Sequence, residues 1–448
     1  MSMKNSYLEK TIRSFHHCAD WIFLNSPSGA SATVSLDAES SLFVRFNNHR
    51  VRQNIQVEQA TAKILLTWQQ KSYRFSFSIT NHPDEDLKKI KVPFLKIIKD
   101  WDNLLSENVD FKITPKQSSS SYLWSEHNPN HILDFVAKAT SHVDFTGLMT
   151  IGPVLSCVRN SNGVSHEFLT ELVTIDYSLY DGPRAAKGLY SSRDWNEHKF
   201  MQQLRQTQSL LEMMKKPKVE LTPDTYRVYL GPGAVSEMAQ MLNWGAVSQR
   251  SYRLGRNPLK RLIEKETELS PLFSVSEDFS LGMGPQFNSL GEKSPPLIPI
   301  IQKGNLMNLF TSTKSAIEFS VESNLAEEDE GFRSMSIDTG ALKREDILPA
   351  LGTGIFISNL HYLNWSNPMD ARITGMTRYA CFWVEKGQIQ GPIVDLRFDD
   401  TLFDLWGQEL EAVTDFSELE PQTTTYFQRH LGGKRVPGML IKKMKFTL

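Results

Sequence analysis

A basic helix end followed by proline divides this chain into two parts. Apolar residues at helical spacing lead into Lys215, Lys216 and Pro217: they are Phe200, Leu204, Leu210, Leu211 and Met214. Cations favour the last turn of a helix and proline cannot continue one, so we place a domain boundary there. A chain of 448 residues is also too long for one ordinary core. The sequence predicts an α+β protein with two domains, an N-terminal sheet-plus-helices domain at 1–217 and a mainly-β domain at 218–448.

The N-terminal domain is expected to carry a sheet with helices packed on it. Helical periodicity predicts helices at about 7–23, at 87–105 with a kink or break at Pro93, and at 130–139, where Asn128 caps the helix. Alternating segments at 41–46 and 50–58 predict a hairpin turning at Asn47-Asn48-His49, because Asn tolerates positive φ. More strands are predicted at 62–68, at 73–79 and between 144 and 176, and the serine run 117–121 is predicted to be an exposed loop.

The second half has short apolar segments broken by Gly and Pro, which predicts strands such as 226–230 and 355–360. Segments 294–299 and 326–331 are predicted to be loops or edges. No internal repeat of the solenoid kind is present.

Charge and composition exclude several classes of protein. The formal net charge is −2 and the pI about 6.6, so no broad positive field exists to bind nucleic acid. No apolar run is long enough to span a membrane, and the N-terminus lacks the apolar core of a signal peptide. The three cysteines, Cys18, Cys157 and Cys381, are distant from one another and odd in number. A disulfide framework is therefore not expected, and a reducing cytoplasm fits.

Two histidine motifs have spacing that could bind a metal. His127 and His131 are four residues apart, as are zinc ligands on one helix face. If Asn128 caps the helix, however, His127 lies before it and the two imidazoles do not share a face. His16-His17-Cys18 has adjacent residues, which point in different directions on a helix, so a solvated or core-edge cluster is expected.

The remaining motifs define no catalytic centre. The sequence contains no phosphate-binding loop, dinucleotide fingerprint or nucleophile elbow. Gly231-Pro232-Gly233 follows a strand and precedes a helix, which is typical of a tight turn, although such a turn can also present amide groups to an anion. Asp399 and Asp400 are adjacent in a predicted strand and so face opposite sides. We expect no catalytic residue and no cofactor from these motifs.

The C-terminal third resembles the TldD/PmbA family, and most of all its PmbA (TldE) branch. The residues that carry the resemblance are Leu351-Gly-Thr-Gly-Ile-Phe-Ile-Ser-Asn-Leu360, Ile373-Thr-Gly375, Cys381-Phe-Trp-Val-Glu-Lys-Gly-Gln-Ile-Gln390 and Leu402-Phe-Asp-Leu-Trp406. The hairpin residues Arg45-Phe-Asn-Asn48 and the segment Val228-Tyr-Leu-Gly-Pro-Gly-Ala234 agree in outline, so the resemblance extends over nearly the whole chain. It implies an internal chamber formed by paired subunits that act on unstructured peptides.

The resemblance also implies where a zinc site would lie, and this chain departs from it. TldD-like subunits hold zinc with a His-Glu-x-x-x-His helix and a distant cysteine, whereas their PmbA-like partners lack these ligands. One alignment of the helix after Gly233 places Gln240 and Gly245 at the histidine positions and Met241 at the glutamate. The alternative keeps Glu237 as the glutamate and places Ser236 and Met241 at the histidines. The cysteine position falls near Pro437, so no metal site is expected.

The peptide-binding candidates come from motif position alone. Segment 355–360 is the expected wall along which an extended peptide would pair with a strand edge. Its candidate residues are Asn359, His361, Tyr362, Thr374 and Arg378. Where the family has an acidic Thr-Gly-Asp-x-Ser turn, this chain has Thr374-Gly-Met-Thr-Arg378. Arg378 is therefore either a substrate contact or a solvated turn residue.

Three hypotheses of function follow. The first is a zinc-less PmbA/TldE-like subunit that pairs with a TldD-like zinc peptidase subunit and frames its peptide substrate. The second is a stand-alone homodimer that binds peptide or regulates without peptidase activity. The third is an enzyme with a rebuilt site that uses His127 with His131, or His430. Metal analysis separates the third hypothesis from the other two.

Overall fold

The computed structural model describes residues 6–106, 118–124 and 127–447. In the first half of this described chain the elements are α1 (Ser6–Asn25), β1 (Ser31–Asn47), β2 (Arg50–Trp68), β3 (Lys71–Ser78), α2 (Pro83–Lys99), β4 (Ser119–Leu123), α3 (Pro129–Ala139), β5 (Asp144–Ile151), β6 (Pro153–Asn160), β7 (Ser165–Glu171), β8 (Val173–Asp181), β9 (Arg184–Ser192) and α4 (Glu197–Met213). Their strands form a nine-stranded sheet in the order β4-β7-β6-β1-β5-β8-β9, with β2 and β3 alongside β1.

The long strand β1 shows why this sheet has two different faces. Its even-numbered residues other than Ser40 are apolar and buried: Ala32, Val34, Leu36, Ala38, Leu42, Val44 and Phe46. Its odd-numbered residues are mostly polar: Thr33, Ser35, Asp37, Glu39, Ser41 and Arg45, with Phe43 among them. Successive side chains of a strand point to opposite faces, so one face of the sheet is apolar and the other polar.

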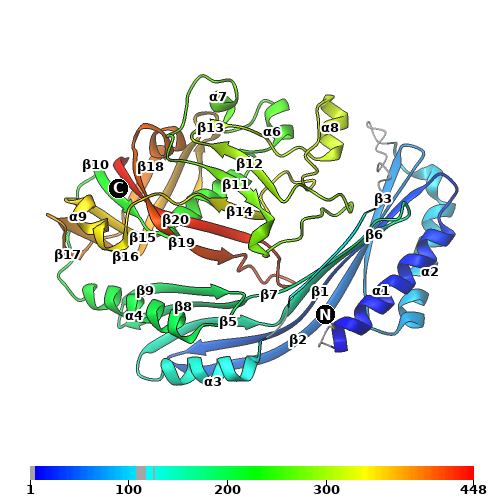
Figure 1. Cartoon of the computed structure of the whole chain (residues 1–448), viewed down its shortest axis with the longest axis horizontal. Coiled ribbons are helices and arrows are strands. Elements are labelled where there is room, and N and C mark those ends of the chain that lie inside the picture. Colours follow the sequence, from blue (N-terminus) through cyan, green and yellow to red (C-terminus); the bar gives the residue numbers. More distant parts are fainter. Residues whose placement is uncertain (1–5, 107–117, 125–126, 448) are drawn as a thin grey trace.

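Helices cover the apolar face in two groups. α1 and α2 pack on one part of β1 together with β2 and β6, around Phe15, Ile22 and Phe94. α3 and α4 pack on the other part together with β5 and β8, around Val136, Phe200 and Leu204. The C-terminal half lies over the opposite, polar face of the sheet (Figure 1). The sheet residues that face the C-terminal half are therefore mostly polar, and a cleft lined by residues of both halves lies there.

The second half is built around another sheet. Its elements are β10 (Thr225–Leu230), α5 (Pro232–Gln240), α6 (Gln249–Arg253), α7 (Lys260–Ile263), β11 (Val275–Asp278), β12 (Leu297–Gln302), β13 (Asn305–Leu306), α8 (Thr313–Phe319), β14 (Ser334–Ile337), α9 (Ile347–Leu351), β15 (Gly354–Asn367), β16 (Arg372–Glu385), β17 (Gln388–Pro392), β18 (Arg397–Thr401), β19 (Leu410–Pro421) and β20 (Gly433–Lys445). The strand order is β13-β12-β11-β14-β20-β10-β15-β16-β17, with β18 beside β16 and β19 beside β20.

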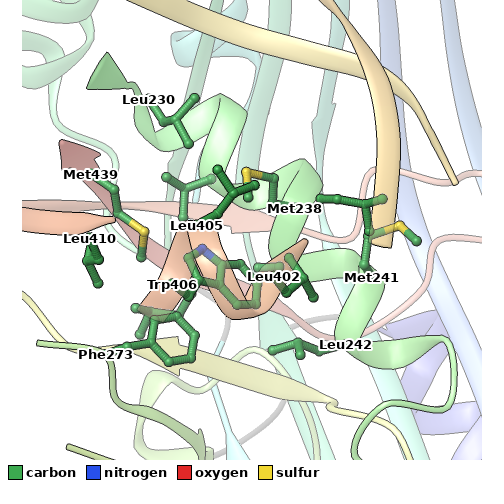
Figure 2. Packing of buried hydrophobic residues seen from close by; sticks show 14 of the residues in the cluster. Leu230, Met238, Met241, Leu242, Phe273, Leu402, Leu405, Trp406, Leu410 and Met439 are labelled. Atoms are coloured by element: carbon green, nitrogen blue, oxygen red, sulfur yellow. The ribbon is translucent and has the colours of Figure 1, made fainter. Parts of the chain in front are cut away.

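The core of the second half surrounds Trp406, which lies in the helical turn Asp404–Gln408. The indole ring stacks on Phe273 with ring centroids 4.6 Å apart. Met238 of α5 and Met241, which directly follows this helix, lie in the same cluster, beside Leu402 and Leu405 (Figure 2). One side of α5 is therefore used entirely for packing.

The α+β prediction is confirmed, and so are several local ones. The predicted first helix corresponds to α1, and the Asn47–His49 hairpin joins β1 to β2. Asn128 caps α3, since its side chain accepts hydrogen bonds from the backbone N–H groups of Asn130 and His131. Segment 326–331 is a loop, as expected. The boundary at 217 stays a prediction, although each sheet draws its strands from one side of it.

Two local predictions are wrong. Segments 50–58 and 62–68 form one strand, β2, because its pairing with β1 continues without a break from Gln53 to Thr67. Residues 119–121, predicted as loop, belong to β4, which pairs in parallel with β7; Gln117 lies outside the described residues. Both errors reflect a distant partner strand that local patterns do not contain. Of the two alternatives at Pro93, a division into two helices is excluded, because α2 continues through this residue.

Cys18, Cys157 and Cys381 are free and buried. None of the described helices combines the length and the apolar character needed to cross a membrane.

Candidate functional site

Helix α5 begins in a tight turn that brings it close to β15. The Gly231 carbonyl accepts hydrogen bonds from the N–H groups of Ala234 and Val235, which starts the helix. A Cβ atom on Gly233 would lie 2.4 Å from Nδ2 of Asn359, so only glycine allows this approach without moving Asn359. Gly231-Pro232-Gly233 thus acts as a strand-to-helix turn packed against a predicted peptide-binding residue.

The other side of α5 faces a polar cluster contributed by both halves. Lys434 on β20 donates hydrogen bonds from Nζ to the Ser236 carbonyl, at 3.1 Å, and to Oε1 of Gln240, at 3.2 Å. Glu420 on β19 is the cross-strand neighbour of Lys434. Glu237 on α5 and Lys187 on β9 complete the group, since both interact electrostatically with its charges. We call Glu237, Glu420, Lys434 and Lys187 the cleft cluster.

The carboxyl groups of the cleft cluster titrate abnormally. Burial raises the pKa of Glu420 above its usual range, against the opposing effect of Lys434. Burial also raises the pKa of Glu237, again opposed by Lys434 and Lys187. Solvent still reaches the Glu237 side chain, as expected for a group surrounded by protein in a cleft. Carboxyl groups with shifted pKa values are typical of functional sites, although structural ion pairs also shift the pKa of a carboxyl group.

These shifts predict a pH effect that Glu420→Gln removes. A raised pKa in the folded state means that the carboxyl group stabilises the protein below its unfolded pKa and that this stability is lost as pH rises through the folded pKa. The melting temperature of Glu420→Gln relative to the unmodified protein is therefore expected to be higher near pH 8 than near pH 4. Thermal unfolding at both values measures this difference. Glu220→Gln, at an exposed position outside the cleft, is the matched control; an equal response in both variants would contradict the assignment.

A groove continues from the cleft cluster along the polar face of the first sheet. Asp176 on β8 pairs with Lys187 and borders two adjoining pockets. The larger has a volume of about 510 Å³ and is lined by residues of β1, β2, β5 and β8 that include Phe43, Arg45, Gln53, Leu148 and Tyr180. The smaller lies beneath residues 421–430. Both pockets share Leu148, Asp176 and Thr425, so they form one continuous groove.

Four of the five predicted peptide-binding residues come together on β15 and β16. Asn359 pairs with Arg378 across the two strands. Arg378 donates a 2.9 Å hydrogen bond from Nη1 to Nδ1 of His361, whose ring lies 4.4 Å from that of Tyr362. Because a guanidinium group only donates, Nδ1 of His361 is unprotonated and the ring proton is on Nε2. Burial, followed by the Arg378 charge, lowers the pKa of His361.

Thr374 is separate from this group. It lies four residues from Arg378 on β16, where Oγ1 donates to the Phe398 carbonyl at 2.8 Å and accepts from Nε of Arg397 at 3.1 Å. Its hydroxyl is used within the β16–β18 pair. Tyr362, by contrast, is 79% exposed and has a φ of +55°, and Tyr379 beside Arg378 has a φ of +64°. Positive φ in bulky residues is strained and tends to occur at functional sites.

The predicted pairing of a peptide along 355–360 is wrong for its first residues. Ile355, Phe356 and Ile357 pair with β10 on one edge and with β16 on the other, so their backbone groups are already used. Strand addition needs an edge with free N–H and C=O groups. The alternating pattern of the sequence does not reveal which strands lie on either side.

The histidine motifs do not converge. His127 lies before the helix, with Nδ1 3.4 Å from Oε1 of Glu171, whereas Nε2 of His131 lies 3.7 Å from Oε1 of Glu197. His16 contacts Glu167 and His17 faces Asp84. Glu126, which precedes His127, lies outside the described residues. The described part of the chain holds no group of three or more His, Cys, Asp or Glu side chains placed to bind a metal.

The adjacent aspartates and His430 also have separate surroundings. Asp399 pairs with Arg372, whereas Oδ2 of Asp400 accepts from the Lys445 backbone N–H. His430 lines the smaller pocket, and its Nε2 lies 3.3 Å from the Tyr426 carbonyl.

The side chains at the candidate zinc positions, on α5 and directly after it, do not fit a zinc site. Met241 is buried in the Trp406 core and Ser236 is fully buried. Gln240 accepts a hydrogen bond from Lys434, whose positive charge opposes a nearby cation. Pro437 on β20 has no donor atom in its side chain. The sequence has no histidine between His198 and His361, so no change of alignment restores an imidazole ligand to this helix.

Comparisons with known proteins agree with this arrangement. Residues 223–448 match the sequence profile of the PmbA/TldA metallopeptidase C-terminal domain. Three similar solved structures each share 14% sequence identity with this chain. Each match covers 99% of this chain and 100% of the other protein's chain. They are a candidate modulator of DNA gyrase from Bacteroides thetaiotaomicron (TM-score 0.77), TldE from Thermococcus kodakarensis (0.73) and a candidate modulator of a DNA gyrase from Thermotoga maritima (0.72). No curated protein sequence matches the chain.

The fold and the matched domain place the protein in a metallopeptidase-like class. The match covers just over half of the chain, and the chain belongs to the PmbA/TldD family. The structural likeness at 14% identity shows the fold only.

The groove and most of the cleft cluster were not predicted from the sequence. Their residues come from segments around 43–55, 146–187 and 420–434, which no short motif connects. A signal was nevertheless present, because β1 alternates apolar with polar residues over most of its length. An antiparallel strand with one polar face predicts an open sheet surface, and this surface is the floor of the groove.

Proposed function

We propose that this protein is a non-catalytic, TldE-like subunit that pairs with a TldD-like zinc peptidase and frames the peptide which that subunit cleaves. The observation that carries the proposal is that both sides of α5 already make contacts within this chain. The helix that corresponds to the zinc-binding helix of TldD-like subunits has one side in the Trp406 core and the other against Lys434. A chain built in this way needs another subunit to activate water.

The interdomain groove supports the framing role. It combines aromatic and aliphatic side chains with a few polar groups, as sites for extended ligands do. Asn359, His361, Tyr362 and Arg378 form a second candidate contact, at the bulged part of β15 and β16. Thr374 is the weakest of the proposed contacts, since its hydroxyl is already engaged. The proposed pair would act in the cytoplasm, without nucleic acid or membrane.

Reconstitution tests this proposal. The full chain is incubated with an unstructured peptide alone, with a TldD-like subunit carrying the His-Glu-x-x-x-His motif, and with that subunit after its glutamate is changed to glutamine. Mass spectrometry of the products is expected to detect cleavage only in the second mixture. Cleavage by this chain alone would support a rebuilt active site instead. A stable homodimer that binds peptide but neither binds nor assists the partner would support the stand-alone alternative.

The contact around Arg378 is tested separately by substitution. Arg378→Met removes the hydrogen bond to His361 and the positive charge beside Tyr379. Exposed charged contacts contribute little to stability, so the melting temperature is expected to change little. Cleavage by the reconstituted pair is expected to require about tenfold more peptide, as one charge-assisted contact would give. Arg253→Met, at an exposed position on α6, is the control, and an equal effect in both variants would exclude Arg378 as a peptide contact.

A further inference from the structure

The larger pocket of the groove contains one positively charged side chain whose charge is not matched. Arg45 on β1 is exposed and lines this pocket. None of the hydrogen bonds or ion pairs found among the described residues involves its guanidinium group. The acidic side chain in the same pocket, Asp176, is paired with Lys187. The pocket therefore has an uncompensated positive charge at Arg45.

The surroundings of Arg45 fit an extended chain that ends in, or carries, a carboxylate. Gln53 and Leu148 are the direct cross-strand neighbours of Arg45 on β2 and β5, so all three side chains lie on one face of the sheet. Phe43 and Ile55 form the next pair along the same two strands, also in the pocket. The apolar pair Phe43 and Ile55 thus lies beside the polar pair Arg45 and Gln53. The two pairs are two residues apart along each strand, as are alternate side chains of an extended peptide.

The chemistry of Arg45 selects the charge of the ligand. A guanidinium group donates two parallel hydrogen bonds to a carboxylate, which a single ammonium group cannot do. The Tyr180 hydroxyl and the Gln53 amide line the same pocket and are further donors. Beyond Asp176 the groove continues past Thr425 to Pro421, which directly follows Glu420 of the cleft cluster.

We infer that Arg45 is the anchor for a peptide carboxylate, and that the groove binds extended peptides with an acidic group at the Arg45 end. This inference rests on the proposed function for the identity of the ligand as a peptide. The carboxylate comes either from the C-terminus of the peptide or from an Asp or Glu side chain. Both sources have the same chemistry, and the experiment separates them.

The test uses fluorescence anisotropy of the full chain with three labelled peptides of one unstructured sequence. The first has a free C-terminal carboxylate, the second a C-terminal amide, and the third a C-terminal amide with one internal glutamate. The first is expected to bind about 10- to 100-fold more tightly than the second, as loss of a charge-assisted, bidentate contact gives. Recovery of affinity by the third peptide would identify a side-chain carboxylate as sufficient. Without recovery, the C-terminus would be the ligand.

Substitutions connect the preference to Arg45. Arg45→Met is expected to remove the difference between acid and amide peptides, and Arg45→Lys to restore part of it, since Lys keeps the charge but not the paired donors. Arg52→Met is the matched control, because Arg52 is exposed on the same hairpin and does not line the pocket. Affinity for the acid peptide is also expected to fall with added salt.

Three results would overturn the inference: equal affinity for all three peptides, no binding of either peptide that carries a carboxylate, or an unchanged preference in Arg45→Met. Failure of the inference and failure of the proposed function give different results. Reconstituted cleavage that ignores a carboxylate at either position would leave the partner role intact and reject Arg45. A preference for acid peptides in a chain that supports no cleavage would support Arg45 as the anchor and reject the partner role.

Discussion

Arg429→Met is expected to lower the free energy of unfolding by about 2–4 kcal/mol, because it leaves several buried acceptors without a donor. From Nη1, Arg429 donates to the Gly152 carbonyl at 2.8 Å and to Oγ of Ser41 at 3.1 Å, and from Nη2 it donates to the Leu172 carbonyl at 3.1 Å. Its backbone N–H donates to Oε1 of Glu39. Burial lowers the pKa of Arg429 to about 10, with Glu39 and Glu171 acting in the opposite direction.

The same substitution is expected to release segment 421–432 from the first sheet. This segment covers the smaller pocket and places the exposed Tyr426 and Phe427 beside the groove. Urea unfolding measures the stability change, and hydrogen exchange of residues 421–432 measures the release. Arg13→Met, at an exposed position on α1, is the control and is expected to change stability little. Unaltered exchange in Arg429→Met would show that other contacts hold the segment.

Trp406→Ala is expected to cost about 3–5 kcal/mol, the range for removing a large aromatic side chain from a packed core. The indole is fully buried and stacks on Phe273. The cavity would adjoin Met238 of α5 and Met241 directly after it (Figure 2), so the helix that borders the cleft should also lose order. Chemical unfolding gives the stability change. Trp244→Ala, at a position 49% exposed, should cost far less, and equal losses would contradict the assignment of Trp406 to the core.

Local sequence signals predicted the elements whose causes are themselves local. Apolar spacing located α1, and Asn128 followed by Pro129 located the start of α3. The Gly231-Pro232-Gly233 turn was correctly placed between strand and helix. In each case the physical reason lies within a few residues of the element.

Predictions failed where distant pairing decides the structure. The serine run becomes β4 because β7, more than forty residues later, supplies the hydrogen bonds. Segment 355–360 was proposed as an open edge, but β10 occupies that edge at Ile355–Ile357. Composition and periodicity do not report which strand lies next to which, and this information decides whether an edge can bind a ligand.

The candidate site likewise has features that follow from the sequence and features that depend on distant packing. The lack of histidine on α5 follows from the sequence alone, whereas the position of Lys434 against Ser236 and Gln240 depends on the packing of β20 beside the helix. Arg45 was noted only as part of a hairpin motif. Its role as a pocket residue emerges from the register of β1 with β2 and β5.

We propose that this chain lacks a catalytic zinc and depends on a partner that has one. Zinc quantitation of the purified chain, of the TldD-like partner and of their co-purified complex tests it most directly. We expect no stoichiometric zinc in this chain and, in the complex, only the zinc that the partner supplies. Stoichiometric zinc in this chain alone, accompanied by peptide cleavage that a chelator abolishes, would contradict it.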